Sequence, residues 1–365
     1  MTSQKTNRPV VGIACNRETY GLDVGDIDRQ RLEAVSELRF EEFDLPTSWD
    51  EPPVADADTD ARFRTFVSGL DAIVVCHGSP RVTAEAMDAS PNLRFIGELE
   101  GDRFAQRIDV EAAIERGIRS IDTTQGSSYP VSEWALAMML IGLRNAGSLY
   151  RKLIDHQHVF EDDSRYKDPG FLRGELTGKT VGMIGAGHIG RRLLELLKPF
   201  RLNVLVHDPY VPREIADIYD LTMTSLDNVM SVPDVVVCLA PITPATRGMI
   251  GEREIGLLKP GAVFVNVSRG AIVDSDALIA RLQKGDVVAS LDVFEPEPIP
   301  VDSPIRDLPN AFITPHIAGV TAANSHRFFS LMVDELLRFF DGHETRYDLL
   351  PQTLANRRGT PPATR

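Results

Sequence analysis

Short apolar runs alternate with longer stretches of mixed apolar and polar residues along most of the chain. Val10–Cys15 and residues 71–76 have the length and the β-branched content of buried strands. Residues 28–37 lie between them and space their apolar positions as a helix does. This order predicts a small parallel α/β domain in the first third, with further strands at 39–45 and 93–96 and a loop at 46–60.

The same alternation continues in the second half of the chain. Strands are predicted at 179–184, 203–207, 235–239, 262–267 and 287–291. A turn-rich segment at 126–130 precedes a helix at 131–144, whose apolar residues are dense enough for burial on most sides. A helix at 320–340 is long enough to return to the first domain. We therefore expect an α/β protein with a discontinuous first domain, its segments being 1–125 and 316–345, a second domain at 126–315, and a tail at 346–365 that is disordered at its end.

A glycine-rich loop joins the strand at 179–184 to a helix at 191–197. In Gly185-Ala186-Gly187-His188-Ile189-Gly190, the first glycine permits a tight turn, the second lets the backbone approach a pyrophosphate, and the third allows close packing of helix on strand. The helix N-terminus favours phosphate, and His188 is expected to cover it. Asp208 ends the next strand, about where a ribose-binding acid is expected. The plain alternative is a glycine turn without a nucleotide, but this context favours a dinucleotide site that prefers NAD to NADP.

Three charged side chains in the second half each follow a short β-like stretch. Arg269 follows residues 263–268, Glu297 lies between two prolines, and His316 follows Thr314-Pro315. Parallel strands bring such residues to the carboxyl edge of a sheet, where open α/β sheets bind ligands. A cation, a carboxylate and an imidazole together can hold an anionic substrate and move a proton, which predicts an enzyme. Glu295 is the competing carboxylate, and we expect it to be a solvated charge at the rim of the site.

Together, the glycine loop, Asp208, residues 263–274, Leu291-Asp292-Val293-Phe294 and Thr314-Pro315-His316 resemble the D-isomer-specific 2-hydroxyacid dehydrogenase family over roughly residues 131–340. The resemblance implies two Rossmann-like domains of doubly wound parallel sheet, NAD as cofactor, and a homodimer formed through the NAD-binding domains. It makes Arg269 the substrate anchor, His316 the acid/base and Glu297 its orienting partner. Besides the glycine loop and Asp208, it places along the cofactor Leu239, Ala240, Pro241, Thr246, Val267, Ser268, Asp292 and Ala318, with Asp292 near the carboxamide.

The reaction that this resemblance implies is the interconversion of a D-2-hydroxy acid and its 2-oxo acid by hydride transfer. Glu297 would favour the charged form of the His316 ring, so reduction should favour mildly acidic pH and oxidation alkaline pH. One alternative is a related dehydrogenase that acts on a phosphonate, a phosphorus oxyacid or another unusual anion. Another is an NAD(H)-sensing, corepressor-like binding protein. A formate-oxidising relative fits less well, because formate oxidation needs no proton relay.

One loop departs from the family pattern. Residues 97–109 keep only Gly101 near the place of a glycine-containing anion cradle, acidic side chains flank it, and the segment is longer than usual. We expect Arg103 or Arg107 to replace part of this cradle by binding the anionic end of the substrate in a bidentate fork. His77, at the end of a first-domain strand, is a further candidate for substrate contact. The alternative is that both arginines pair at the surface with Glu98, Glu100 or Asp102.

Composition limits the partners and the compartment. The chain has 365 residues, enough for two domains, and a net charge of −14, which argues against nucleic acid or an anionic membrane as a partner. A small anionic substrate must then be attracted by local cations. The three cysteines are isolated, which favours reduced core thiols and no metal site. Residues 1–9 lack the apolar stretch of a signal peptide, and no apolar run is long enough to span a bilayer, so we expect a cytoplasmic protein.

Overall fold

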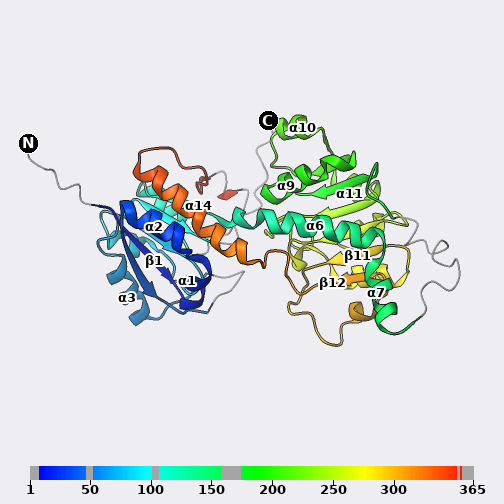
Figure 1. The fold of residues 1–365 in the computed structure, drawn as a ribbon, viewed down its shortest axis with the longest axis horizontal. Coiled ribbons are helices and arrows are strands. Elements are labelled where there is room, and N and C mark those ends of the chain that lie inside the picture. The colour runs from blue at the N-terminus through cyan, green and yellow to red at the C-terminus, as the bar shows by residue number, and fades with distance from the viewer. Residues whose placement is uncertain (1–7, 47–51, 101–106, 158–173, 352–353, 356–365) are drawn as a thin grey trace, which may run out of the picture. The chain divides into compact units, whose positions relative to one another are not determined.

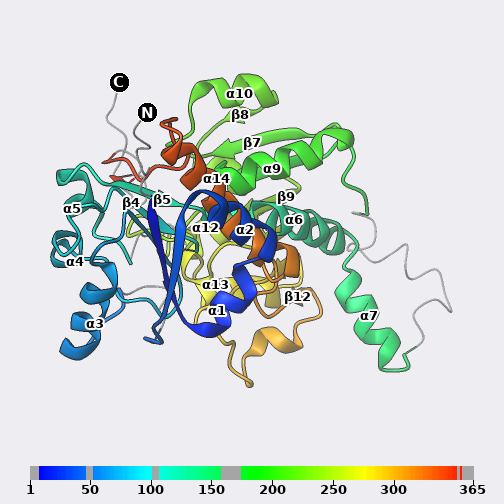
Figure 2. The ribbon, with the colours of Figure 1, turned by 60° about the vertical axis from the view of Figure 1, so that its left-hand side comes forward.

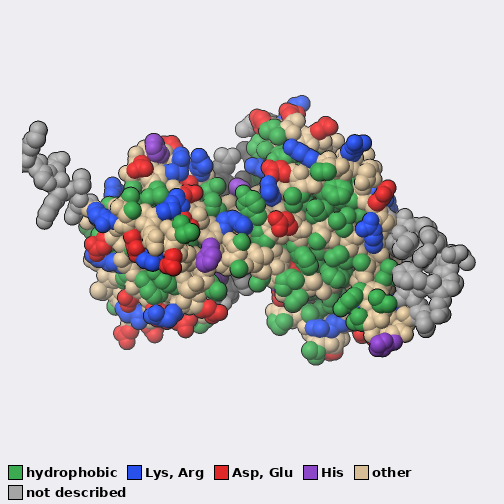
Figure 3. Space-filling view, viewed as in Figure 1, with side chains coloured by type: hydrophobic (Ala, Val, Ile, Leu, Met, Phe, Trp, Pro, Cys, Tyr) green, Lys and Arg blue, Asp and Glu red, His purple; other side chains and the backbone are tan. Residues whose placement is uncertain are grey.

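The computed structural model describes residues 8–46, 52–100, 107–157, 174–351 and 354–355. The chain divides into two units, which Figure 1 shows as ribbons. Unit 1 combines Met1–Ser127 with Thr321–Arg357, and unit 2 is Ser128–Val320. The described residues up to 127 and those from 321 onward therefore fold together. On the face of unit 1 seen in Figure 3, acidic and basic side chains are interspersed.

Unit 1 is built on a parallel sheet of five strands in the order β2-β1-β3-β4-β5. The interior strands are almost wholly buried because helices cover both faces of the sheet (Figure 2). The edge strand β2 exposes charged side chains, and it lies two to three residues earlier than the sequence predicts. The strands are β1 Val10–Cys15, β2 Glu37–Glu42, β3 Ala72–Val75, β4 Phe95–Glu98 and β5 Arg119–Asp122.

Helix α14 (Ala322–Phe340) is the last long helix of the chain, and its apolar face packs into the core of unit 1. Phe328 and Phe329 on this helix are buried in one cluster with Phe95 of the sheet. The predicted helix at 320–340 is thus confirmed. The expected loop at 46–60 is wrong at its end, because Asp56 caps a helix that begins at Ala57. The other helices of the unit are α1 Arg17–Asp23, α2 Asp26–Val35, α3 Ala57–Val67, α4 Ala84–Asp88, α5 Val110–Glu115 and the 3-10 turn η1 Thr124–Ser127.

Unit 2 contains a parallel sheet of seven strands in the order β12-β11-β10-β9-β6-β7-β8. From β6 the chain moves to β7 on one side and later to β9 on the other, so the topological switch point lies between β6 and β9. Ligands of open α/β sheets bind outside the carboxyl ends of the strands at such a point. The strands are β6 Thr180–Ile184, β7 Asn203–His207, β8 Thr222–Met223, β9 Val235–Cys238, β10 Val263–Asn266, β11 Val288–Leu291 and β12 Ala311–Ile313.

The helices of unit 2 cover this sheet on both faces. Helix α6 begins at Ser128, earlier than the predicted 131, and buries residues on most sides against the sheet. The helical elements of the unit are α6 Ser128–Leu143, α7 Ala146–Ile154, α9 His188–Leu197, η3 Lys198–Phe200, α10 Arg213–Tyr219, α11 Leu226–Ser231, α12 Glu252–Leu257, η4 Gly270–Ile272, α13 Ser275–Gln283 and η5 Pro304–Asp307. Among the described residues, no helix has the length and apolar character needed to cross a membrane. The three cysteines are buried and free, as predicted.

Candidate active site

At two positions of the loop between β6 and α9, the backbone leaves room only for glycine. Gly185 has φ +97°, and a Cβ there would lie 3.0 Å from the backbone nitrogen of Ala240. A Cβ on Gly190 would lie 2.8 Å from the carbonyl oxygen of Gly185. Gly187 is the N-cap of α9, has no side-chain cap, and faces open space where a Cβ would stand. The N-terminus of α9 is therefore a bare cradle that fits the phosphates of a dinucleotide.

Asp208 ties this loop to the second strand of the sheet. Its Oδ2 accepts a hydrogen bond from the backbone N–H of Ala186 at 2.8 Å, and its Oδ1 accepts from the N–H of Tyr210 at 2.9 Å. Each carboxylate oxygen has two lone pairs, so both oxygens retain an acceptor site for a ribose hydroxyl. The side chain is half-buried beside the N-terminus of α9. The structure thus places a carboxylate side chain where the sequence predicts the ribose acid.

The loop after β9 lies beside the glycine loop at the same edge of the sheet. Its residues Leu239 and Ala240 are buried and contact Gly185. The hydroxyl of Thr246 donates to the carbonyl oxygen of Pro241 at 2.7 Å and accepts from the N–H of Thr243 at 2.7 Å. Thr246 therefore fixes the shape of this loop. Its contact with a cofactor stays a prediction.

Asn266 organises the turn that presents Arg269, and sequence reasoning missed it. Its Oδ1 accepts from the N–H of Ser268 at 3.1 Å and from the Ser268 hydroxyl at 2.9 Å, and its Nδ2 donates to the carbonyl oxygen of Arg269 at 3.1 Å. The Ser268 hydroxyl also lies 3.3 Å from the sulfur of Cys238 at the end of β9. An asparagine that ends a buried strand two residues before a serine is a signal for such a turn. Val267 is buried beside it.

His316 and Glu297 come together in the structure. Nδ1 of His316 lies 3.0 Å from Oε1 of Glu297, and the two side chains are 36% and 34% exposed. Because an ionised carboxylate only accepts hydrogen bonds, Nδ1 carries the proton in this contact. Proton exchange with a substrate then falls to Nε2. Glu297, which the family resemblance favours over Glu295, therefore contacts the imidazole.

Asp292 builds the loop that carries His316. The side chain is completely buried at the end of β11, where its Oδ2 accepts from the N–H of Ala318 at 2.8 Å and its Oδ1 accepts from the N–H of Ile317 at 3.0 Å and from the Thr314 hydroxyl at 2.5 Å. Its carbonyl oxygen accepts from the N–H of His316 at 2.8 Å. These bonds hold His316 at φ +53°, a conformation that few residues other than glycine adopt. A contact of Asp292 with the cofactor carboxamide stays a prediction.

Strand order places these groups along one edge. Strands β9, β10, β11 and β12 are neighbours in the sheet, and they lead respectively into Ala240, Arg269, Asp292 and His316. The edge therefore combines a guanidinium and an imidazole–carboxylate pair with a dinucleotide cradle. Among the described residues, no group of three His, Cys, Asp or Glu side chains could hold a metal ion.

A second polar cluster lies in unit 1, at the carboxyl ends of β3 and β4. Arg107 is almost fully buried, and its Nη1 donates to Oε1 of the buried Glu98 at 2.9 Å. Its Nη2 donates to Nδ1 of His77 at 3.0 Å, so Nε2 of His77 carries the proton that faces Glu100 at 3.2 Å. The pairing of Arg107 with Glu98, which was the alternative to substrate contact, thus exists, but inside the protein and not at its surface. Contact of Arg107 with a substrate stays a prediction. Gly101 and Arg103 lie outside the described residues.

Burial changes the acidity of groups beside this cluster. Burial, together with the smaller effect of the Glu100 charge, raises the pKa of Asp23 to about 7. Cys76, whose sulfur lies 3.8 Å from Oδ2 of Asp23, has its pKa raised well above the usual value, again chiefly by burial. Cys238 in unit 2 has a pKa raised to about 11 for the same reason. These thiols therefore stay protonated at neutral pH and are poor nucleophiles.

The chain is similar in sequence to proteins of one known family. Residues 136–318 match the model of the D-isomer specific 2-hydroxyacid dehydrogenase, NAD binding domain. The chain is 32% identical over 278 residues to D-3-phosphoglycerate dehydrogenase of Methanocaldococcus jannaschii. This alignment covers 76% of this chain but only 51% of that protein. The chain thus spans about half the length of that relative. It is 34% identical over 269 residues to the mitochondrial formate dehydrogenase of Solanum tuberosum, covering 72% of this chain and 68% of that protein.

The fold is shared with solved structures. A phosphoglycerate oxidoreductase from Rhizobium etli aligns with a TM-score of 0.77 and 23% identity, covering 93% of this chain and 98% of that one. An identity this low supports the fold alone. It agrees with the predicted α/β class of two Rossmann-like domains.

Proposed function

Because the chain belongs to the D-isomer-specific 2-hydroxyacid dehydrogenase family, we propose that it is an NAD-dependent oxidoreductase that interconverts a D-2-hydroxy acid and its 2-oxo acid. The observation that carries this proposal is the contact of 3.0 Å between His316 and Glu297. His316 follows β12, and Arg269 follows β10, which is two positions away in the same sheet. A hydroxyl proton and a carboxylate are the two features of a 2-hydroxy acid that such residues handle.

The chain's own residues divide the work as follows. Arg269 holds the carboxylate of the substrate and directs its carbonyl group, and this positioning lowers the barrier. In reduction, Nε2 of His316 donates a proton to the developing alkoxide, and in oxidation the neutral ring takes the hydroxyl proton. Glu297 orients the ring through Nδ1 and stabilises its charged form. Bound NAD supplies the hydride chemistry, held by the N-terminus of α9 and by Asp208.

Formate oxidation explains the site less well, although a formate dehydrogenase is among the relatives. Formate loses a hydride and becomes carbon dioxide without a hydroxyl proton to remove. The pair of His316 and Glu297 would then have no proton to move. The substrate that we propose instead is an anion with a hydroxyl group to oxidise, and a phosphonate or another oxyacid is the alternative within the same family.

The test is an absorbance assay of the nicotinamide in both directions. NADH oxidation is followed with a panel of 2-oxo acids, and NAD reduction is followed with a phosphonate and a phosphorus oxyacid. Turnover of one or more 2-oxo acids supports the proposal, and turnover of only the phosphorus compounds favours the related dehydrogenase. NADH binding without turnover of any compound would favour a sensor that binds the dinucleotide and a protein partner. Formate with NAD is included, and efficient oxidation of formate would contradict the role given to His316.

Substitution of Asp208 tests the choice of cofactor. In Asp208→Asn the side chain loses the charge that repels a 2′-phosphate but keeps an oxygen to accept one of its two backbone hydrogen bonds. We expect the ratio of kcat/KM for NADH over NADPH to fall by about tenfold or more. Asp217→Asn, which removes an exposed charge from helix α10, is the matched control and should leave the ratio unchanged. An unaltered ratio in Asp208→Asn would mean that another residue selects the cofactor.

Substitution of Glu297 tests the partner of the imidazole. Glu297→Gln keeps a hydrogen-bond acceptor for Nδ1 but removes the charge that stabilises the imidazolium. Reduction needs the imidazolium, so we expect partial activity and a pH profile of reduction that moves to lower pH. Glu295→Gln is the control and should keep the profile of the wild type. The opposite result, a shift in Glu295→Gln alone, would assign the role to Glu295.

A homodimer is the oligomeric state that we propose. Helix α7 exposes Tyr150, Leu153 and Ile154, which are 64%, 61% and 55% accessible and form an apolar surface that a second copy would cover. Leu153→Asp should shift the protein from dimer to monomer in sedimentation velocity. Ile218→Asp, at an exposed apolar residue of α10, should leave the dimer intact. A wild-type protein that sediments as a monomer contradicts the proposal.

A further inference from the structure

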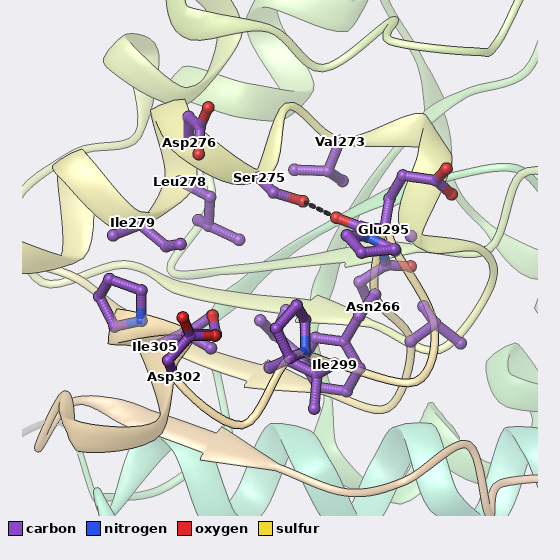
Figure 4. A pocket seen from close by; sticks show the side chains of 18 residues that line it. Asn266, Val273, Ser275, Asp276, Leu278, Ile279, Glu295, Ile299, Asp302 and Ile305 are labelled. Carbon is purple, nitrogen blue, oxygen red and sulfur yellow. Dashed lines mark hydrogen bonds between the residues drawn. The ribbon is translucent and has the colours of Figure 1, made fainter.

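A pocket of about 300 Å³ lies within unit 2, outside the residues proposed above to contact the cofactor and the substrate. Its walls are helix α13 and the segment 293–305, which follows β11. Figure 4 shows Leu278 and Ile279 on one side of the space, with Asp302 and Ile305 across from them. Sites for small ligands begin at about this volume. The pocket is large enough for a compact molecule such as a single aromatic ring with a short side chain.

The floor of the pocket is apolar. Leu278, Leu291, Val293 and Ile305 are all buried, and each belongs to the lining. Such a floor gains free energy by covering an apolar body. The floor therefore selects a ligand with an aliphatic or aromatic group.

The rim of the pocket is acidic. Asp276, Glu295 and Asp302 line it, and all three residues are exposed. None of the 18 lining residues is a lysine or an arginine, although the guanidinium of Arg306 lies beside the rim and donates to the carbonyl oxygens of Pro300 and Ile299, each at 2.8 Å. Three lining carboxylates beside this one neighbouring cation leave an excess of negative charge, which favours a positively charged group over an anion. The rim and the floor together describe an amine that carries an apolar body.

We propose that this pocket is a second ligand site, which binds a small apolar amine. This ligand chemistry is opposite in charge to the anionic substrate of the proposed reaction. The site is thus suited to a ligand that regulates the enzyme and is not itself converted. The regulatory part of the proposal rests on the proposed function, whereas the binding part does not.

The pocket is joined to both parts of the catalytic edge. Phe294, Glu295 and Pro296 form one of its walls and directly precede Glu297. The hydroxyl of Ser275 donates to the carbonyl oxygen of Glu295 at 3.1 Å and fixes this wall to α13, as Figure 4 shows. Asn266, which holds the turn of Arg269, lines the same pocket. An occupant that presses on this wall moves Glu297 relative to His316 and lowers kcat, with no contact at the nucleotide cradle.

Calorimetric titration of the full-length protein with 2-phenylethylamine tests binding. We expect saturable binding with a Kd on the order of 1 mM, given the few atoms of this probe. The anion 3-phenylpropionate has the same ring with the opposite charge and should not bind. No saturation by the amine up to about 20 mM, well above the expected Kd, would overturn the proposal. Equal binding of the anion would overturn it as well.

Two variants locate the site. Ile279→Trp fills the pocket and should abolish binding of the amine, and Asp302→Asn removes a rim charge and should weaken binding by about threefold. Asp307→Asn, from the neighbouring η5 turn but outside the lining, is the matched control and should bind as the wild type does. Binding that survives in Ile279→Trp would place the ligand elsewhere. Circular dichroism verifies that each variant is folded.

Kinetics test the regulatory part. In the assay with a 2-oxo acid, saturating 2-phenylethylamine should lower kcat without changing the KM for NADH, and Ile279→Trp should be insensitive to the amine. Inhibition that is purely competitive with the 2-oxo acid would overturn the regulatory role, because it would place the amine at the catalytic edge. If no 2-oxo acid is turned over, the titration still decides whether the amine binds, so failure of the reaction and failure of the site are separate results.

Discussion

His316→Ala should lower kcat for reduction of the 2-oxo acid by about 10²- to 10⁴-fold, the usual contribution of a positioned general acid. The substitution removes the ring whose Nδ1 contacts Glu297, and with it the only proposed proton donor. The cradle for the dinucleotide is formed by other elements, the glycine loop and the N-terminus of α9. The Kd of NADH, measured by quenching of protein fluorescence, should therefore stay within about threefold of the wild-type value, since no bond to the cofactor is lost.

A second histidine provides the control for this result. His343 is exposed in unit 1, and His343→Ala should keep wild-type kinetics. If His316→Ala retains most of its activity, another group supplies the proton and the proposed mechanism fails. If NADH affinity falls as steeply as kcat, the loop of residues 314–318 supports the cofactor, and His316 has a structural role in place of the chemical one.

Much of the sheet edge that carries Arg269 and His316 could be predicted because its signals are local. A parallel strand that ends in a charged residue places that residue at the carboxyl edge whatever the rest of the fold does. This rule places Arg269 and His316 at one edge, at the ends of β10 and β12, which are two positions apart in the strand order. The glycine loop could be predicted as well, because steric contacts of the loop itself require glycine at Gly185 and Gly190.

What could not be predicted depends on contacts between distant residues. The choice of Glu297 over Glu295 rested on the family resemblance, because the residues alone do not show which carboxylate of the folded loop meets the imidazole. The buried pair of Arg107 and Glu98 likewise requires the fold, since exposed and buried ion pairs look alike in sequence. Strand β5 was missed for a third reason. Its residues include Ser120 and Asp122, which are polar yet buried, so the strand lacks an apolar pattern.

Gly270 lies where the turn that carries Arg269 meets the segment that leads to Glu297. A Cβ on this residue would overlap the carbonyl group of Phe294, which is backbone and cannot rotate away. Gly270 directly follows Arg269, and Phe294 lies three residues before Glu297. The close approach of these two segments therefore fixes Arg269 and Glu297 relative to each other.

Gly270→Ala should lower the free energy of unfolding by about 3 kcal/mol or more, because an added methyl group in a filled site forces the backbone apart. In the folded fraction we expect kcat/KM for the 2-oxo acid to fall by about tenfold or more, since positioning is lost at Arg269 and Glu297. Gly256→Ala is the matched control. Gly256 is exposed in α12, a Cβ there meets nothing within 4 Å, and alanine should raise stability by about 0.5 kcal/mol. Urea unfolding of both variants measures the difference, and equal stabilities would show that the two segments separate at little cost.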